Sequence, residues 1–179
     1  MKTKILIAVI AIVFVTVNLA QAELKPTLHS GLYLGLGVGG GTASMNFQDG
    51  NSIGRDGGFV NFRIGGAFNQ KMMMGLEVDT WATEEYGATW SLTNVTLAMI
   101  YYPHDKIFVK AGPGFAEASV EYNGVTGSTS GGGFTLGGGA EFRLTDKFAL
   151  VPTLNVLFQG FEGFDTSMVS LMLGFNWFL

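Results

Sequence analysis

The chain has 179 residues, of which 47% are hydrophobic and only 13% are charged, and it contains 27 glycines and no cysteine. Fourteen acidic residues against ten basic ones argue against nucleic acid as a partner. Abundant apolar and aromatic residues with so little charge argue against a disordered chain, and without cysteine the fold has no disulfide to stabilise it.

The first 22 residues have the pattern of a secretory signal peptide. Two lysines precede an apolar run over residues 5–17, and the small-x-small site Ala20-Gln21-Ala22 follows. The run is shorter than the roughly 20 apolar residues that a spanning helix needs. We therefore expect residues 1–22 to be removed and residues 23–179 to form one domain. An exported, hydrophobic chain without a spanning helix points to a closed β-barrel, the other structure that can cross a lipid bilayer.

Eight later stretches alternate apolar and polar residues with the period of two that is typical of a β-strand. We expect strands over residues 31–40, 59–68, 72–82, 89–102, 106–118, 133–144, 148–158 and 166–179. In the last stretch Val169, Leu171 and Leu173 lie on one face, whereas Ser170 and Gly174 lie on the other. The alternating glycines of 31–40 lack the Lys-Ser/Thr ending of a phosphate loop, and we expect them to leave room for bulky neighbours inside a narrow barrel.

The connections between these strands alternate in length. Those after the second, fourth and sixth strands have about three residues. The others are longer and rich in glycine, over residues 41–58, 83–88, 119–132 and 159–165. Short periplasmic turns and long external loops are typical of a transmembrane barrel, and an even number of strands places both termini in the periplasm. The predicted fold is all-β: an eight-stranded antiparallel up-and-down transmembrane β-barrel.

The charged residues well inside the predicted strands share one face. They are Arg63, Glu77, Asp79, Lys110, Glu141 and Arg143. A charge facing lipid near mid-membrane costs roughly 2–4 kcal/mol, so this face should be the lumen. We predict a polar network that fills the lumen, with Arg63 opposite Glu77 and close enough for an ion pair, although the same charges could line a narrow pore. Pro113 and Pro152 lie within strands, and we expect local bulges or strand ends there.

Several segments together resemble the small outer-membrane β-barrel family that includes the OmpA transmembrane domain and the opacity-type proteins. These are Gly31-Leu-Tyr-Leu-Gly-Leu-Gly-Val-Gly39, Tyr101-Tyr-Pro103, Phe108-Val-Lys-Ala-Gly112, Gly137-Gly-Gly-Ala-Glu-Phe-Arg143 and the aromatic terminal strand. The resemblance implies a Gram-negative outer-membrane protein in contact with outer-membrane lipid and lipopolysaccharide. It also implies insertion by the outer-membrane assembly machinery, which reads an aromatic final strand, here Phe175, Trp177, Phe178 and Leu179. Such strands usually end in phenylalanine, and this one ends in leucine.

The sequence predicts no catalytic site. Some similar barrels modify lipid A with a nucleophile and a base at the outer membrane face. The two histidines, His29 and His104, both fall on the predicted periplasmic side. The loop carboxylates lack the spacing of a calcium loop, so we expect no metal and no cofactor. We expect a structural or surface-interaction role carried by the external loops toward an unknown ligand. The alternatives are a narrow channel for ions or small apolar molecules and, third, a lipid A-modifying enzyme.

Overall fold

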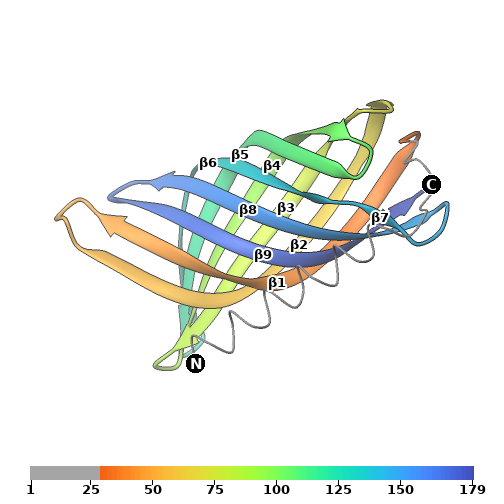
Figure 1. Cartoon of the computed structure of the whole chain (residues 1–179). Helices are drawn as coiled ribbons and strands as arrows, with labels where there is room; N and C mark the ends of the chain where they lie inside the picture. The colour runs from red at the N-terminus through yellow and green to blue at the C-terminus, as the bar shows by residue number, and fades with distance from the viewer. Residues whose placement is uncertain (1–28) are drawn as a thin grey trace, which may run out of the picture.

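The structure is a computed structural model that describes residues 29–179, so the predicted signal peptide lies outside the described residues. These residues form nine strands (Figure 1): β1 (Leu32–Phe47), β2 (Ser52–Asn69), β3 (Met72–Glu85), β4 (Ala88–His104), β5 (Ile107–Tyr122), β6 (Val125–Ala140), β7 (Phe142–Arg143), β8 (Phe148–Phe161) and β9 (Phe164–Phe178). Among residues 29–179 no helix is long and apolar enough to cross a membrane.

The nine strands close into one antiparallel barrel. From β1 to β6 each strand pairs with the next along the chain, β9 pairs with both β8 and β1, and β6 pairs with β8. The two-residue strand β7 pairs with β8 in the register that β6 has already set, so it continues β6 beyond Glu141. β6 and β7 therefore count as one strand of the wall, and the predicted eight-stranded all-β barrel is confirmed.

The barrel wall is apolar outside and mostly polar at the middle of its inner face. On β9 the outward Leu173 is 44% exposed, whereas the inward Ser170 is 1% exposed. The same alternation places Val60 and Phe62 of β2 outside and Asn61 inside. A period of two in the sequence thus separates two environments, because successive side chains of a strand point to opposite faces.

The barrel has two different ends. The terminal end carries His29, the C-terminal Leu179 and the turns at residues 70–71, 105–106 and 144–147. The opposite, hairpin end carries the turns at 48–51, 86–87, 123–124 and 162–163 (Figure 1). Two of these hairpin turns, Tyr86-Gly87 and Asn123-Gly124, have positive φ at both residues, which is the type I′ geometry that matches the twist of paired strands.

The prediction of long loops at the hairpin end is wrong. β1 and β2 stay paired up to Asn46 and Ser52, and β5 and β6 stay paired up to Tyr122 and Val125. Strand pairing satisfies the backbone polar groups of these glycine-, serine- and threonine-rich segments without needing large side chains. The asymmetry between the two ends therefore lies in how far the strands extend, since the turns themselves are short at both ends.

The two prolines produce neither of the predicted features, a local bulge or a strand end, in their own strands. Pro113 pairs with Phe134 of β6 and Pro152 pairs with Leu173 of β9 within continuous registers. The β4–β5 ladder omits two residue pairs beside Pro113 and resumes in the same register, and the break between β6 and β7 lies beside Pro152. Each missing N–H is thus accommodated by a local gap in one ladder.

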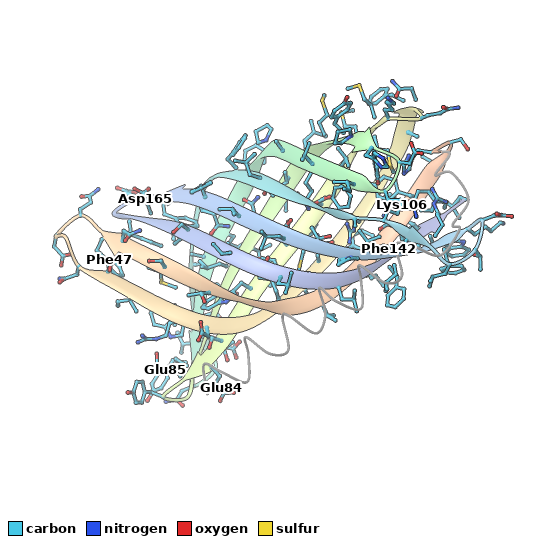
Figure 2. All side chains as sticks on the ribbon, viewed as in Figure 1. Phe47, Glu84, Glu85, Lys106, Phe142 and Asp165 are labelled. Atoms are coloured by element: carbon cyan, nitrogen blue, oxygen red, sulfur yellow. The ribbon has the colours of Figure 1, made fainter. Side chains whose placement is uncertain are left out.

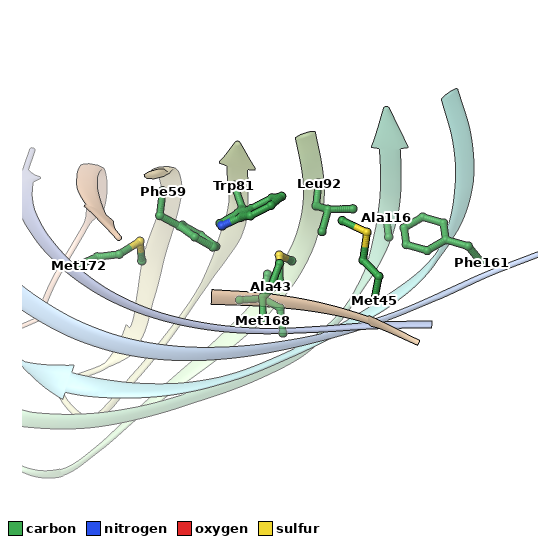
Figure 3. Packing of buried hydrophobic residues seen from close by; sticks show 10 residues of the cluster. Ala43, Met45, Phe59, Trp81, Leu92, Ala116, Phe161, Met168 and Met172 are labelled. Carbon is green, nitrogen blue, oxygen red and sulfur yellow. The ribbon is translucent and has the colours of Figure 1, made fainter. Parts of the chain in front are cut away.

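Three layers of side chains occupy the interior. Nearest the hairpin end is an apolar cluster, the upper plug: Ala43, Met45, Phe59, Trp81, Leu92, Ala116, Leu157, Phe161, Met168 and Met172. Figure 3 shows these side chains converging from opposite walls. Nearest the terminal end is the lower plug: Tyr33, Met73, Ile100, Tyr102, Phe108, Ala149, Val151 and Phe178. Between the two plugs lies a central polar layer of buried side chains, among them Asn61, Arg63, Glu77 and Lys110.

Candidate functional site

The strongest candidate site is a pocket at the hairpin end, here called the mouth. It has a volume of about 430 Å³ and is lined by side chains and backbone from β1, β4, β5, β6 and β9. Its lining residues are Met45, Phe47, Trp90, Ser91, Leu92, Ala118, Ser119, Val120, Gly127, Ser128, Thr129 and Phe164. The lining is mainly apolar and aromatic, and Trp90 remains 37% exposed.

The floor of the mouth is closed. Met45 and Leu92 belong both to the mouth and to the upper plug, where they are 5% and 2% exposed. Phe47 and Phe164 pack against the plug from above, with ring centroids 5.8 Å apart. The mouth is therefore a concave pocket whose floor is a packed core.

A smaller recess of about 50 Å³ adjoins the mouth and shares Met45, Phe47 and Trp90 with it. The recess adds an ion pair, in which Nε of Arg55 donates to Oε2 of Glu85. The two side chains keep 40% and 32% of their surface exposed. The recess thus combines a carboxylate, a guanidinium and two aromatic side chains.

Acidic residues surround the mouth. Among residues 29–179 the hairpin end carries eight carboxylates and one basic side chain, Arg55, for a net charge of −7. The carboxylates are those of Asp49, Asp56, Glu84, Glu85, Glu117, Glu121, Glu162 and Asp165. Figure 2 shows Glu84, Glu85 and Asp165 at this end. The backbone N–H of Asn51 and its side-chain amide donate to Asp49 at 3.0 and 2.7 Å, which lowers the pKa of the Asp49 carboxyl.

Four of the six charged residues predicted for the lumen lie in the central polar layer. Arg63, Glu77, Asp79 and Lys110 are each at most 2% exposed. The predicted register is confirmed, since Arg63 lies directly opposite Glu77. The ion pair of Glu77, however, is with Lys110, and Asp79 accepts a hydrogen bond of 2.9 Å from Asn61.

The other two charged residues lie at the terminal end. Nε of Arg143 donates to Glu141 at 2.7 Å, and the Arg143 guanidinium lies 3.5 Å from the ring centroid of Phe178. Glu141 also accepts from the hydroxyl of Tyr102 at 2.8 Å, and Nε2 of His29 lies 3.4 Å from each of its oxygens. This cluster, far from the mouth, packs within the lower plug.

The residues of the predicted assembly signal divide between the two faces of β9. Phe175, Trp177 and Leu179 point outward and are 52%, 43% and 60% exposed, whereas Phe178 points inward and is 6% exposed. The Trp177 ring stacks on Phe148 of β8 with centroids 5.8 Å apart. The outward side chains complete the apolar outer surface at the terminal end.

Sequence reasoning missed the mouth and the role of His29. Eight of the twelve lining residues of the mouth lie in segments that the sequence predicts as loops, and only Trp90, Ser91, Leu92 and Ala118 lie in predicted strands. Ala43 and Met45 lie on the inner face with Tyr33, opposite to Leu32, Leu34, Leu36 and Val38, so the apolar residues change face beyond residue 40. The sequence shows only that His29 precedes the first strand, whereas in the structure its ring is buried at 3% exposure and lies 3.9 Å from the Tyr102 ring, centroid to centroid. Within residues 29–179, no group of three or more His, Asp or Glu side chains could hold a metal ion.

A closed antiparallel barrel with an apolar outer face and buried inner charges defines a transmembrane β-barrel. The chain belongs to the outer membrane protein beta-barrel domain family, whose model matches residues 7–176. The family places it in the Gram-negative outer membrane. A comparison with curated protein sequences returned no match.

Solved structures agree with this fold. Neisserial surface protein A (NspA) superposes with a TM-score of 0.71 at 14% identity, over 84% of this chain and 98% of NspA. Ail, the attachment invasion locus protein of Yersinia pestis, superposes with a TM-score of 0.57 at 14% identity, over 82% of this chain and 99% of Ail. At these identities the similarity establishes the fold alone.

Proposed function

We propose that this protein is a surface-binding protein of the outer membrane, with the hairpin end toward the external medium, both termini in the periplasm, and the mouth as the seat of an apolar ligand. The observation that carries the proposal is the mouth itself, a concave apolar pocket of about 430 Å³ at the end of a closed barrel. Small-molecule sites are typically apolar clefts of about 300–1,000 Å³ with a few polar groups.

The closed interior supports binding over conduction. Beneath the mouth lie the upper plug, a central layer of side chains that are at most 4% exposed, and the lower plug. An eight-stranded barrel has an interior just wide enough for side chains to fill. A planar-bilayer conductance that stays at baseline is the expected result, and defined single-channel steps would favour the narrow-channel alternative.

The orientation of the barrel follows the usual arrangement of the class. Transmembrane barrels carry their short turns on the periplasmic side and their larger extensions outside, and the larger extensions here are those at the hairpin end. An epitope inserted between Asn123 and Gly124 should be labelled by antibody on intact cells. Labelling only after the outer membrane has been permeabilised would contradict this orientation.

A structural neighbour supports the idea of a ligand at the surface of such a barrel. Ail has been solved in complex with the heparin analogue sucrose octasulfate, and that structure superposes with a TM-score of 0.55 at 15% identity. Ligand binding by a small barrel is thus compatible with this fold. The chemistry of the ligand must come from the residues of this chain.

The test uses the neutral fluorescent probe N-phenyl-1-naphthylamine and the full barrel in lipid nanodiscs, with empty nanodiscs subtracted. Ala118 lines the mouth, so Ala118→Trp should fill the pocket and remove saturable binding. Glu117, the preceding residue, is exposed on the outer face, so Glu117→Trp is the matched control and should bind as the wild type does. Equal binding by both variants, or no saturable binding by the wild type, would refute a ligand seat in the mouth.

We also propose that the outer apolar surface contacts outer-membrane lipid and lipopolysaccharide, and that β9 is read by the assembly machinery. The support is the exposed aromatic face of β9 at Phe175 and Trp177. Replacement of Trp177 by serine should slow insertion in an assembly assay with purified machinery. An unchanged insertion rate would contradict the proposed recognition of β9 through Trp177.

A further inference from the structure

The recess beside the mouth is lined by a carboxylate, a guanidinium and aromatic side chains, which bear on the charge of a ligand. We propose that the ligand of the mouth is a lipophilic cation, whose apolar body fills the mouth and whose positive charge replaces Arg55 against Glu85 and Trp90. This inference rests on the proposed function, since it names the chemical class of ligand for the same site. It goes further in assigning the charge and the two residues that select it.

The wall of the recess already carries a cation of the chain itself, Arg55. Arg55 and Glu85 form an ion pair in the wall of the recess, which Phe47, Trp90 and Met45 also line. A carboxylate beside aromatic faces is the combination that recognises organic cations, because the negative face of an aromatic ring attracts a positive charge. The ion pair shows that Glu85, beside these aromatic side chains, already holds one organic cation, the guanidinium of Arg55.

Arg55 can leave the recess without breaking the barrel wall. The β2–β3 ladder extends toward the hairpin end only to the pair Gly58–Ala82, so Arg55 and Glu85 both lie beyond it. At this level β2 pairs with β1, in which Ala43 is the partner of Arg55. A half-exposed ion pair contributes little to the stability of the protein. The barrel is therefore destabilised only slightly when a ligand cation displaces Arg55 from Glu85.

The surrounding charge favours the same sign of ligand. The carboxylates at the hairpin end outnumber its single basic side chain by seven, and they create a negative potential that concentrates cations near the mouth. An anionic ligand would have to approach against this potential and leave Glu85 close to its own charge. The charge pattern thus opposes a sulfated ligand of the kind solved with Ail.

The test compares two ions of the same shape and opposite charge. Tetraphenylphosphonium and tetraphenylborate each compete with N-phenyl-1-naphthylamine for the barrel in nanodiscs, with empty nanodiscs as the blank. Wild-type protein should release the probe at lower concentrations of the phosphonium than of the borate. Raised salt should narrow this difference, because screening weakens the field of the exposed carboxylates.

Two substitutions should change the preference in opposite directions. Arg55→Gln frees the carboxylate of Glu85 and should tighten phosphonium binding about fivefold, the equivalent of one exposed charge pair. Glu85→Gln should weaken phosphonium binding and relieve the exclusion of the borate. Neither exposed side chain lies in a plug, so both variants should fold, and a heat-dependent shift in gel mobility verifies this.

The outcomes separate the two proposals. If the neutral probe does not bind, or still binds to Ala118→Trp, there is no ligand seat and both proposals fall. If the probe binds in the mouth but the borate competes as well as the phosphonium, or Arg55→Gln weakens phosphonium binding, the ligand seat stands and the assignment of a cation is overturned. Stronger phosphonium competition together with opposite effects of the two substitutions supports it.

Discussion

Gly39 of β1 provides the sharpest test of how the barrel closes. Gly39 is the register partner of Met172 on β9, at the seam between the first and last strands. A Cβ atom at Gly39 would lie 2.1 Å from the carbonyl oxygen of Leu171 and 2.7 Å from the Cα of Met172. Both are backbone atoms, so Gly39→Ala must push the two strands apart at the seam.

The matched control lies two residues earlier on the same face of the same strand. A Cβ atom at Gly37 would lie 3.6 Å from the Cα of Gly174 and 3.7 Å from the nearest side-chain atoms of Arg63 and Asn61, which is ordinary van der Waals contact. We expect Gly39→Ala to lower the free energy of unfolding by about 1–3 kcal/mol through overpacking. Gly37→Ala should be neutral or raise it by about 0.4–1 kcal/mol, because alanine restricts the unfolded chain.

The measurement is equilibrium unfolding by urea in phospholipid vesicles, followed by tryptophan fluorescence, with gel mobility as an independent measure of the folded fraction. The difference between the two alanine variants is the decisive quantity, since it cancels the common effect of adding a methyl group. Equal unfolding free energies, or a larger loss for Gly37→Ala than for Gly39→Ala, would refute the view that backbone contact at the seam requires glycine.

Three further predictions concern the wall, the central layer and one turn, all measured by the same unfolding assay. Leu173→Arg should cost about 2–4 kcal/mol because Leu173 faces lipid mid-strand, whereas Ser170→Ala on the inner face should be tolerated; equal costs would reverse the faces. Lys110→Met should cost about 3–5 kcal/mol by leaving the buried Glu77 unpaired, and adding Glu77→Gln should recover most of that loss. A double variant as unstable as the sum of the singles would refute this pairing. Gly124→Ala should cost about 1 kcal/mol from its φ of 78° alone, as no atom lies within 4 Å of the added Cβ; an unchanged stability would show that the turn relaxes.

Which strand residues face outward and which face inward could be predicted from the sequence, because the membrane requires an apolar outer face. Each outward residue of β9 from Val169 to Trp177 is apolar, as is Leu179 after it, and Arg63 and Glu77 lie on the inner faces of their strands, as their charges require. The same alternation also fixes which residues of neighbouring strands face each other once the turn is known. It therefore predicts the Arg63–Glu77 register but leaves open which cation pairs with Glu77, since Lys110 reaches Glu77 from β5, two strands away.

The extent of the strands and the position of His29 could not be read in the same way. β6 begins with Val125-Thr-Gly-Ser-Thr-Ser-Gly131, where neither face is apolar, so nothing in the pattern distinguishes a paired strand from a loop. His29 contacts Glu141 across 112 residues of sequence, and no local signal marks that contact. Both features depend on pairing between distant segments, which a period of two does not encode.

The mouth differs from the rest of the interior in leaving large apolar side chains partly exposed above the upper plug. The upper plug already closes the barrel through buried residues such as Leu92 and Met168, and the wall outside the mouth carries hydroxyls and carboxylates. Above this plug, Trp90 nevertheless presents a large apolar surface to water, 37% of it exposed, and Phe47 and Phe164 are only half-buried. Exposed apolar surface gathered in a concavity is costly unless something covers it, and it marks sites of interaction. The mouth, rather than the fully buried charges of the centre, is therefore where a ligand gains most from binding.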